Sequence, residues 1–170
     1  YADLFKTSES GDKGQLLDGD PSYVTNDVAL VKNLGLNYKV VTGGSEAALI
    51  TAMQKATDNK SALLFYFYEP QYALANIKVA RVALPPYAAG CDADPAKVAC
   101  DYPPYTLNKI ARAAWVDAGG PAVNFLKKFN WTNDDQNQVA SDIAAGKTYD
   151  QAAEAWIAKN QAKVDAWLQG

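Results

Sequence analysis

The sequence predicts an α/β fold in which a mainly parallel sheet is followed by a group of helices. Three observations predict it. Strand-like and helix-like segments alternate over roughly the first two-thirds of the chain, an apolar run without alternation lies within that part, and the last third is helical. A helix is the usual connection that brings the chain back to start a parallel strand, so this alternation favours a parallel sheet. The length of 170 residues suits one domain, or one domain with an appendage.

The first elements come from short, regular patterns. Residues 15–17 form a strand candidate that ends at the turn formers of 18–21. Apolar residues at helical spacing then predict a helix over 24–34, with Gly35 as its C-terminal stop. A run rich in β-formers predicts the second strand over 38–41.

The middle of the chain continues the alternation. Ser45 is a favourable N-cap for a helix whose apolar stripe covers 48–56. The run 62–68 is apolar without alternation, which is typical of a strand buried on both faces of a sheet. Residues 69–70 (Glu-Pro) break that strand, and 77–84 alternate imperfectly and predict another strand.

The last third is interpreted as helical after one ambiguous segment. Residues 107–114 are taken as a strand, although a poor helix is the alternative, and 121–129 are predicted to be a helix. Thr132 and Thr148 each precede a polar side chain by three residues, in the pattern of a capping box that starts a helix. The helix that begins at Thr148 carries apolar residues as far as Trp167. The four tryptophans of this region are expected to pack in the core.

Composition excludes several classes of function. The net charge of −3 is small and its charges are interspersed, which argues against a nucleic-acid partner. The chain has no histidine, so Ser-His-Asp and Cys-His catalysis and most catalytic zinc sites are excluded. No phosphate-binding glycine loop occurs. We therefore expect no catalytic residue, no cofactor and no metal. The start at Tyr1, without a signal peptide, indicates a processed chain, a fragment or a recombinant product.

Cys91 and Cys100 lie in a segment crowded with loop-forming residues. Two cysteines without histidine are a poor zinc site, because two ligands are missing. A disulfide that fastens a long loop is favoured, and it implies an oxidising compartment. The alternative is two free thiols in a cytosolic loop.

Three stretches carry a resemblance to a known family: Val41–Leu49 (VTGGSEAAL), Leu64–Gln71 (LFYFYEPQ), and the tail from Asn130 to Leu168 with its alanine-rich helices and tryptophans. In this order they resemble the substrate-binding proteins of ABC importers for glycine betaine, choline and related compatible solutes. The resemblance covers nearly the whole chain.

The resemblance implies a fold, a function and a location. Residues 1–76 correspond to the second α/β lobe of a type II periplasmic-binding protein, a three-layer arrangement. Residues 77–170 correspond to a returning segment with the disulfide loop and closing C-terminal helices. The N-terminal lobe is expected to be missing, although it is needed for full binding. The function implied is non-enzymatic: binding a quaternary ammonium solute and delivering it to an ABC importer permease, in the periplasm or anchored at the cell surface.

The resemblance also implies binding residues. A quaternary ammonium group has no N–H donor, so aromatic faces must hold it. Tyr68 takes the position of a cage aromatic, and Tyr68 and Gln71 replace the tryptophan and histidine expected in that motif. Asn26 matches a ligand-contacting asparagine, and Tyr23 lies beside it. The alternatives are that Tyr68 caps the core with its hydroxyl in water and that Asn26 is an ordinary capping or turn residue.

Other functions stay open from the sequence alone. The cleft implied by the resemblance is also suited to another small solute, such as an amino acid. A non-catalytic extracellular interaction module would use the cysteine loop as its contact surface, where the tyrosines at positions 87, 102 and 105 stand beside prolines. A hydrolase or transferase on a similar layer is disfavoured by the absence of histidine and of a nucleophile elbow.

Overall fold

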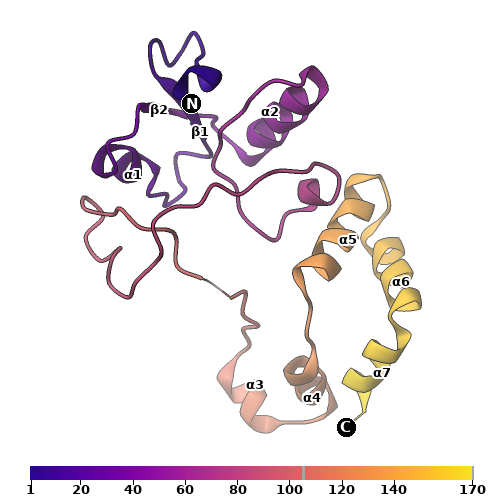
Figure 1. Cartoon of the computed structure of the whole chain (residues 1–170). Coiled ribbons are helices and arrows are strands. Elements are labelled where there is room, and N and C mark those ends of the chain that lie inside the picture. The colour runs from indigo at the N-terminus through magenta and orange to yellow at the C-terminus, as the bar shows by residue number, and fades with distance from the viewer. Residues whose placement is uncertain (105, 170) are drawn as a thin grey trace. The chain divides into compact units, whose positions relative to one another are not determined.

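The computed structural model describes residues 1–104 and 106–169 (Figure 1). Their contacts divide the chain into two compact units. The N-terminal unit consists of Tyr1–Tyr68 and Ile77–Pro104, and the C-terminal unit consists of Glu69–Asn76 and the residues after Pro104. The domains expected from the sequence, 1–76 and 77–170, are two consecutive ranges. That division stays a prediction.

The sheet of the N-terminal unit is parallel, as the sequence predicts. Strand β1 (Gly14–Asp18) pairs with β2 (Tyr38–Thr42) in a register that joins Gly14 to Tyr38 and Asp18 to Thr42. On its other side, β1 contacts a third parallel segment through a bridge between Leu17 and Phe65. The predicted strand over 62–68 is therefore reduced to this one bridge, in which the N–H of Tyr66 donates to the carbonyl of Leu17 at 2.8 Å.

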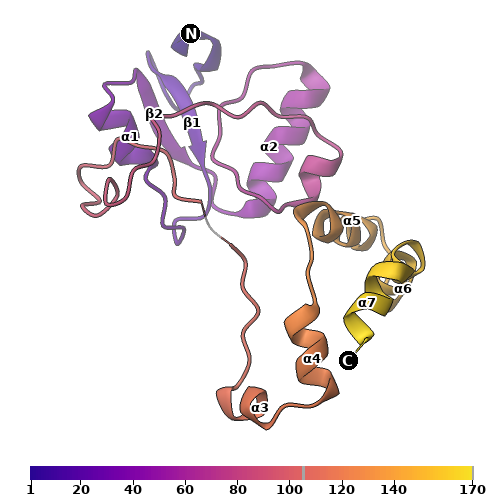
Figure 2. The same cartoon turned by 60° about the horizontal axis from the view of Figure 1, so that its bottom comes forward.

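Two helices flank these strands on opposite sides in both views (Figure 1, Figure 2). Helix α1 (Asp27–Asn33) buries Leu30, and α2 (Glu46–Asn59) buries Leu49 and Met53. The predicted N-cap of α2 is confirmed, since the Ser45 hydroxyl accepts the N–H of Ala48 at 3.1 Å. A short 3₁₀ helix, η1 (Ala2–Phe5), precedes β1.

Two predicted strands are wrong. Residues 77–84 form no regular element, and 107–112 are irregular before a short helix, α3 (Ala113–Ala118). Strand propensity reflects how well a side chain packs against neighbouring strands. A segment with high strand propensity therefore forms no strand where no partner strand is present. Ile110 illustrates this, because 93% of it is exposed.

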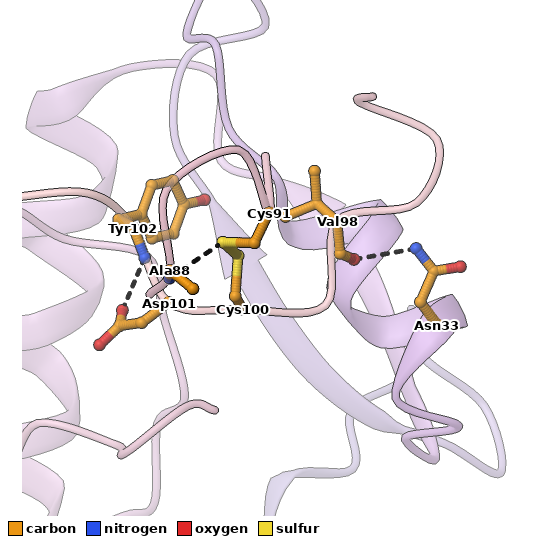
Figure 3. Close-up of a disulfide and its surroundings, with 7 residues drawn as sticks. All are labelled: Asn33, Ala88, Cys91, Val98, Cys100, Asp101 and Tyr102. Carbon is orange, nitrogen blue, oxygen red and sulfur yellow. Dashed lines mark hydrogen bonds between the residues drawn. A yellow bond between two sulfur atoms is a disulfide. The ribbon is translucent and has the colours of Figure 1, made fainter. Parts of the chain in front are cut away.

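The disulfide between Cys91 and Cys100 is confirmed, with their Cα atoms 6.4 Å apart (Figure 3). It closes a loop whose Val98 is fully buried against Leu30 of α1. The Asn33 side chain also holds this loop, because its Nδ2 donates to the carbonyl of Val98 at 2.8 Å. The disulfide loop is thereby fixed to α1, and it carries Tyr102 just beyond its second cysteine.

The C-terminal unit is helical. It contains η2 (Tyr72–Ala75), α3, α4 (Pro121–Lys128), α5 (Asn133–Ala144), α6 (Tyr149–Lys159) and α7 (Gln161–Leu168). Both predicted capping boxes are present, at Thr132 and Thr148. The single helix predicted from Thr148 to Trp167 is divided at Asn160, whose side chain donates to the carbonyl of Trp156 at 2.9 Å. Asparagine favours such local bonds to the backbone over a continuous helix.

An aromatic core holds this unit together. The rings of Trp156 and Trp167 stack with centroids 5.7 Å apart, and both residues are buried. Trp131 lies 5.5 Å from Trp156, and Phe129 lies 4.8 Å from Trp167. The prediction that tryptophans pack in the core is confirmed for these three, whereas Trp115 is 40% exposed.

Candidate functional site

Parallel pairing brings separate parts of the N-terminal unit to one edge of the sheet. The carboxyl ends of parallel strands lie at the same edge, where ligands of open α/β sheets usually bind. Tyr23 follows β1, Glu46 follows β2 at the start of α2, and Tyr66 and Tyr68 follow the bridge at Phe65. Four tyrosines meet there, Tyr23, Tyr66, Tyr68 and Tyr102, which we call the tyrosine cluster.

Three rings of the tyrosine cluster contact one another. The ring centroids of Tyr23 and Tyr66 are 6.3 Å apart, and both lie 6.1 Å from Tyr68. Tyr102 adds a fourth ring at 5.9 Å from Tyr66. These are the distances of aromatic pairs in direct contact. All four side chains are half-buried, so a ligand would lie against their exposed side rather than between them.

The loop after β1 places the Tyr23 ring. The Asp18 carboxylate accepts the backbone N–H of Gly19 at 2.7 Å and the hydroxyl of Thr25 at 2.8 Å, so both ends of the loop are tied to β1. A Cβ atom at Gly19 would stand 2.6 Å from the Tyr23 ring. Glycine at this position therefore lets the ring lie directly on the backbone.

The hydroxyls of Tyr68 and Tyr102 donate to carboxylates. The Tyr68 hydroxyl donates to the Glu46 carboxylate and lies 3.5 Å from the Tyr23 hydroxyl. The Tyr102 hydroxyl donates to Oδ1 of Asp27 at 2.9 Å and accepts the N–H of Asn26 at 2.7 Å. Burial, followed by the hydrogen bonds to Glu46 and Tyr23, raises the pKa of Tyr68. Burial also raises the pKa of Tyr102; the N–H of Asn26 opposes this rise, and the charge of Asp27 adds to it. Both phenols are therefore neutral at physiological pH.

Asp27 is a buried carboxyl group beneath the tyrosine cluster. Only 5% of it is exposed, and its Oδ2 atom is buried without a hydrogen-bond partner among the described residues. Its pKa is raised from 3.8 to about 6, chiefly by burial; the hydrogen bond from Tyr102 acts in the opposite direction, and the nearby charge of Asp18 adds to the rise. At neutral pH this group carries a negative charge that the fold tolerates poorly.

The structure brings together three of the four residues singled out from the sequence. Tyr23 and Tyr68 lie in the tyrosine cluster, and Asn26 joins it through its backbone N–H. Asn26 occupies the N-cap position of α1 without a side-chain capping bond. Gln71 belongs to the C-terminal unit, where it is buried and its Oε1 accepts the N–H of Ala73 at 3.0 Å at the start of η2. Their contacts with a ligand stay predictions.

Sequence reasoning missed Tyr66, Glu46 and Asp27, and it placed Tyr102 only beside the cysteine loop. One signal was present: Tyr66 and Tyr68 are two residues apart in an extended segment, a spacing that directs both side chains to the same face. Tyr102 reaches the tyrosine cluster through the disulfide loop, which no local pattern indicates. Tyr105, also named with that loop, lies outside the described residues.

Other features of the molecule offer weaker candidates. A shallow groove of about 850 Å³ lies between α1 and β2, is lined by residues such as Val28 and Leu36, and contains none of the tyrosine cluster. Within residues 1–104 and 106–169, no group of three histidine, cysteine or acidic side chains is placed to hold a metal. No helix in the same ranges has the length and apolar character needed to cross a membrane.

Comparisons with known proteins agree with one another. Residues 1–159 match the family model described as the substrate binding domain of ABC-type glycine betaine transport systems. The chain is 26% identical over 162 residues to the trimethylamine N-oxide-binding protein of Pelagibacter ubique (strain HTCC1062), covering 92% of this chain and 51% of that protein. The fold is similar to the crystal structure of lactococcal OpuAC in its closed conformation complexed with glycine betaine.

That structural match has a TM-score of 0.63 at 25% sequence identity. It covers 91% of this chain and 57% of the lactococcal chain. The 170 residues thus span about half the length of the relatives that they match.

Proposed function

Because the chain belongs to the family of substrate-binding domains of ABC-type glycine betaine transport systems, we propose that it binds a small quaternary ammonium solute and delivers it to an ABC importer permease. The fold is the α/β lobe of a type II periplasmic-binding protein, with a parallel sheet and C-terminal helices, as the sequence predicts. The observation that carries the proposal is the tyrosine cluster, because three of its rings gather at the edge of the sheet where ligands bind.

Aromatic faces suit a quaternary ammonium head group. The positive charge is spread over methyl groups that cannot donate a hydrogen bond, and it is attracted by the negative face of a ring. Each such contact contributes about 0.5–2 kcal/mol, with the larger value where water is excluded. Tyr23, Tyr66 and Tyr68 supply neighbouring rings, and all three side chains are half-exposed. Tyr23 and Tyr68 act here as ligand-binding residues, with Asn26 as a neighbour on the same loop.

The partner and the location form part of the proposal. We propose that a second lobe is needed for full affinity and that closure of two lobes around the solute is what the permease recognises. Support comes from the length of the relatives, of which this chain spans 51% and 57%. Proteins of this family are extracytoplasmic, and a location in the periplasm or at the cell surface agrees with the disulfide. No covalent chemistry is involved, since the family is one of binding domains.

Replacing Tyr68 with alanine is expected to weaken choline and glycine betaine binding by about two- to thirtyfold, because one ring contact of about 0.5–2 kcal/mol is lost and the Tyr23 ring loses its neighbour. The measurement is thermal unfolding with and without choline, glycine betaine, carnitine, trimethylamine N-oxide or proline. A solute at 100 times its dissociation constant stabilises the native state by about 2.7 kcal/mol. The shift of the unfolding midpoint should shrink in the Tyr68→Ala variant at equal solute concentration.

Tyr38→Ala is the matched control for this experiment. Tyr38 is a half-buried tyrosine of the same unit, but its ring neighbour is Phe5 and it lies outside the tyrosine cluster. The Tyr38→Ala substitution should lower the unfolding midpoint without changing the solute-induced shift of that midpoint. An equal loss of that shift in both variants would contradict the assignment of the site. Stabilisation by proline, with none by trimethylammonium solutes, would favour an amino acid as the ligand.

A further inference from the structure

The disulfide loop is held in place by side chains rather than by regular structure. Residues 77–104 contain no helix or strand. Val98 and Cys100 are buried with Leu30 of α1 in one hydrophobic cluster, and the Asn33 side chain of α1 donates to the carbonyl of Val98 (Figure 3). The position of the loop therefore depends on a few contacts, of which the disulfide is one.

Tyr102 joins the disulfide loop to the tyrosine cluster. It lies two residues after Cys100, and its side chain packs against the same hydrophobic cluster. Its hydroxyl accepts the N–H of Asn26 at 2.7 Å and donates to Asp27 at 2.9 Å, so the far end of the ring is fixed at the start of α1. The near end is fixed by the backbone, which the disulfide ties down at Cys100.

The ring of Tyr102 supports Tyr66, one of the three rings proposed to face the solute. The two ring centroids are 5.9 Å apart and the ring planes stand at 60°, which is an edge-to-face contact. Tyr66 lies in the extended segment that one bridge joins to β1, so neighbouring rings contribute to the orientation of its side chain. Because the Tyr102 hydroxyl is already bound at α1, we expect Tyr102 to act on the solute through Tyr66.

Reduction of the disulfide is expected to loosen this arrangement. A dithiol reductant gives two electrons and two protons to the bond between Cys91 and Cys100: the bond breaks, each sulfur becomes a thiol, and the reductant closes to its own cyclic disulfide. Two thiols need more space than the bond that they replace, and Cys100 is only 6% exposed. Since the surrounding cluster is closely packed, the backbone of the loop must move to separate the sulfurs, and Tyr102 moves with it.

We propose that the disulfide between Cys91 and Cys100 is a positioning element of the solute site, because it holds Tyr102 against Tyr66 and thereby orients the Tyr66 ring. This inference rests on the proposed function of the tyrosine cluster and adds a form of regulation to it. The affinity for the solute is coupled to the oxidation state of two cysteines that lie outside the cluster.

The test measures dissociation constants of choline and of glycine betaine by NMR titration, on the oxidised chain and after reduction with dithiothreitol. We expect reduction to weaken the binding of both solutes by about three- to thirtyfold, where the upper value corresponds to complete loss of one ring contact. The ring resonances of Tyr66 and Tyr102 should shift on reduction, whereas those of Tyr38 should not. The double variant Cys91→Ala/Cys100→Ala should bind like the reduced chain and should not respond to dithiothreitol.

A double-mutant comparison separates positioning from general destabilisation. If the disulfide acts through Tyr102, the substitution Tyr102→Ala should weaken binding to a similar extent in the oxidised chain, and reduction of that variant should cause no further loss. Tyr102→Phe keeps the ring beside Tyr66 and should weaken binding less. Tyr38→Ala is the matched control, because it removes a half-buried ring of the same unit away from the loop and should keep the wild-type response to reduction.

The inference is overturned if the reduced chain stays folded and binds both solutes as tightly as the oxidised chain, or if reduction weakens binding equally in Tyr102→Ala. If reduction unfolds the N-terminal unit, Tyr102→Ala with its disulfide intact decides: weaker binding supports the inference, and unchanged binding overturns it. In all these cases, binding of either solute by the oxidised wild-type chain still supports the proposed function. If that chain binds neither solute at 100 mM, about a hundred times a millimolar dissociation constant, the proposed function is overturned and the inference with it.

Discussion

Replacing Trp156 with alanine is expected to destabilise the C-terminal unit by about 3–5 kcal/mol, the range found when a large buried aromatic is removed. Trp156 is 5% exposed, stacks on Trp167 and contacts Trp131, so its loss leaves a cavity between two other large rings. The Lys163 ammonium also loses a cation–π contact, because it lies 5.6 Å from the centroid of the Trp156 ring. Unfolding in urea, followed by tryptophan fluorescence and by circular dichroism, measures the change in the free energy of unfolding.

Trp115→Ala is the control for that experiment. Trp115 lies on α3 and is 40% exposed, so its removal creates no closed cavity and should cost less than about 1 kcal/mol. Equal effects of the two substitutions would contradict the description of Trp156 as the centre of the aromatic core.

Removing the buried charge of Asp27 is expected to change how stability depends on pH. Its pKa is raised from 3.8 in a model carboxyl group to about 6 in the fold, first by burial. The folded protein therefore binds a proton more tightly than the unfolded chain. The stability that the Asp27 carboxyl group contributes is fully present below pH 3.8, and this contribution is lost as the pH rises through about 6. This difference in pKa corresponds to at most about 3 kcal/mol.

The variant Asp27→Asn should be more stable than the wild-type chain at pH 8, by up to about 3 kcal/mol, because no charge is buried. At pH 3.5 the two should be nearly equal. Free energies of unfolding from urea titrations between pH 3.5 and 8 measure this difference. Tyr102→Phe should move the midpoint of the pH dependence upward, since it removes the hydrogen bond that lowers the pKa of Asp27. A constant difference between Asp27→Asn and wild type across this range would contradict the account.

The sequence predicts those parts of the fold that depend on local contacts. Ser45, Thr132 and Thr148 cap their helices as expected, because a capping bond joins residues three positions apart. The strands expected at 77–84 and 107–114 are absent, since a strand forms only where a partner strand and a buried face are available. Local patterns carry no information on whether such a partner exists.

The candidate site shows the same limit. Tyr68 and Tyr23 follow from the end of a predicted strand and from the family resemblance, and the structure brings their rings to 6.1 Å. Glu46 and Asp27 look like ordinary acidic residues in the first turn of a helix. Their contacts with phenols arise only when loops distant in the chain converge, such as Tyr102 and Asp27, which are 75 residues apart.

The most direct test of the central claim is an NMR comparison of choline with 3,3-dimethylbutan-1-ol, in which a neutral carbon replaces the ammonium nitrogen without changing the shape. We expect the choline methyl protons to shift upfield in the presence of the chain and to show nuclear Overhauser contacts with the rings of Tyr23, Tyr66 and Tyr68. The neutral analogue should bind at least about tenfold more weakly, because it lacks the charge that the ring faces attract. Equal binding of the two compounds, or choline contacts confined to residues outside the tyrosine cluster, would contradict it.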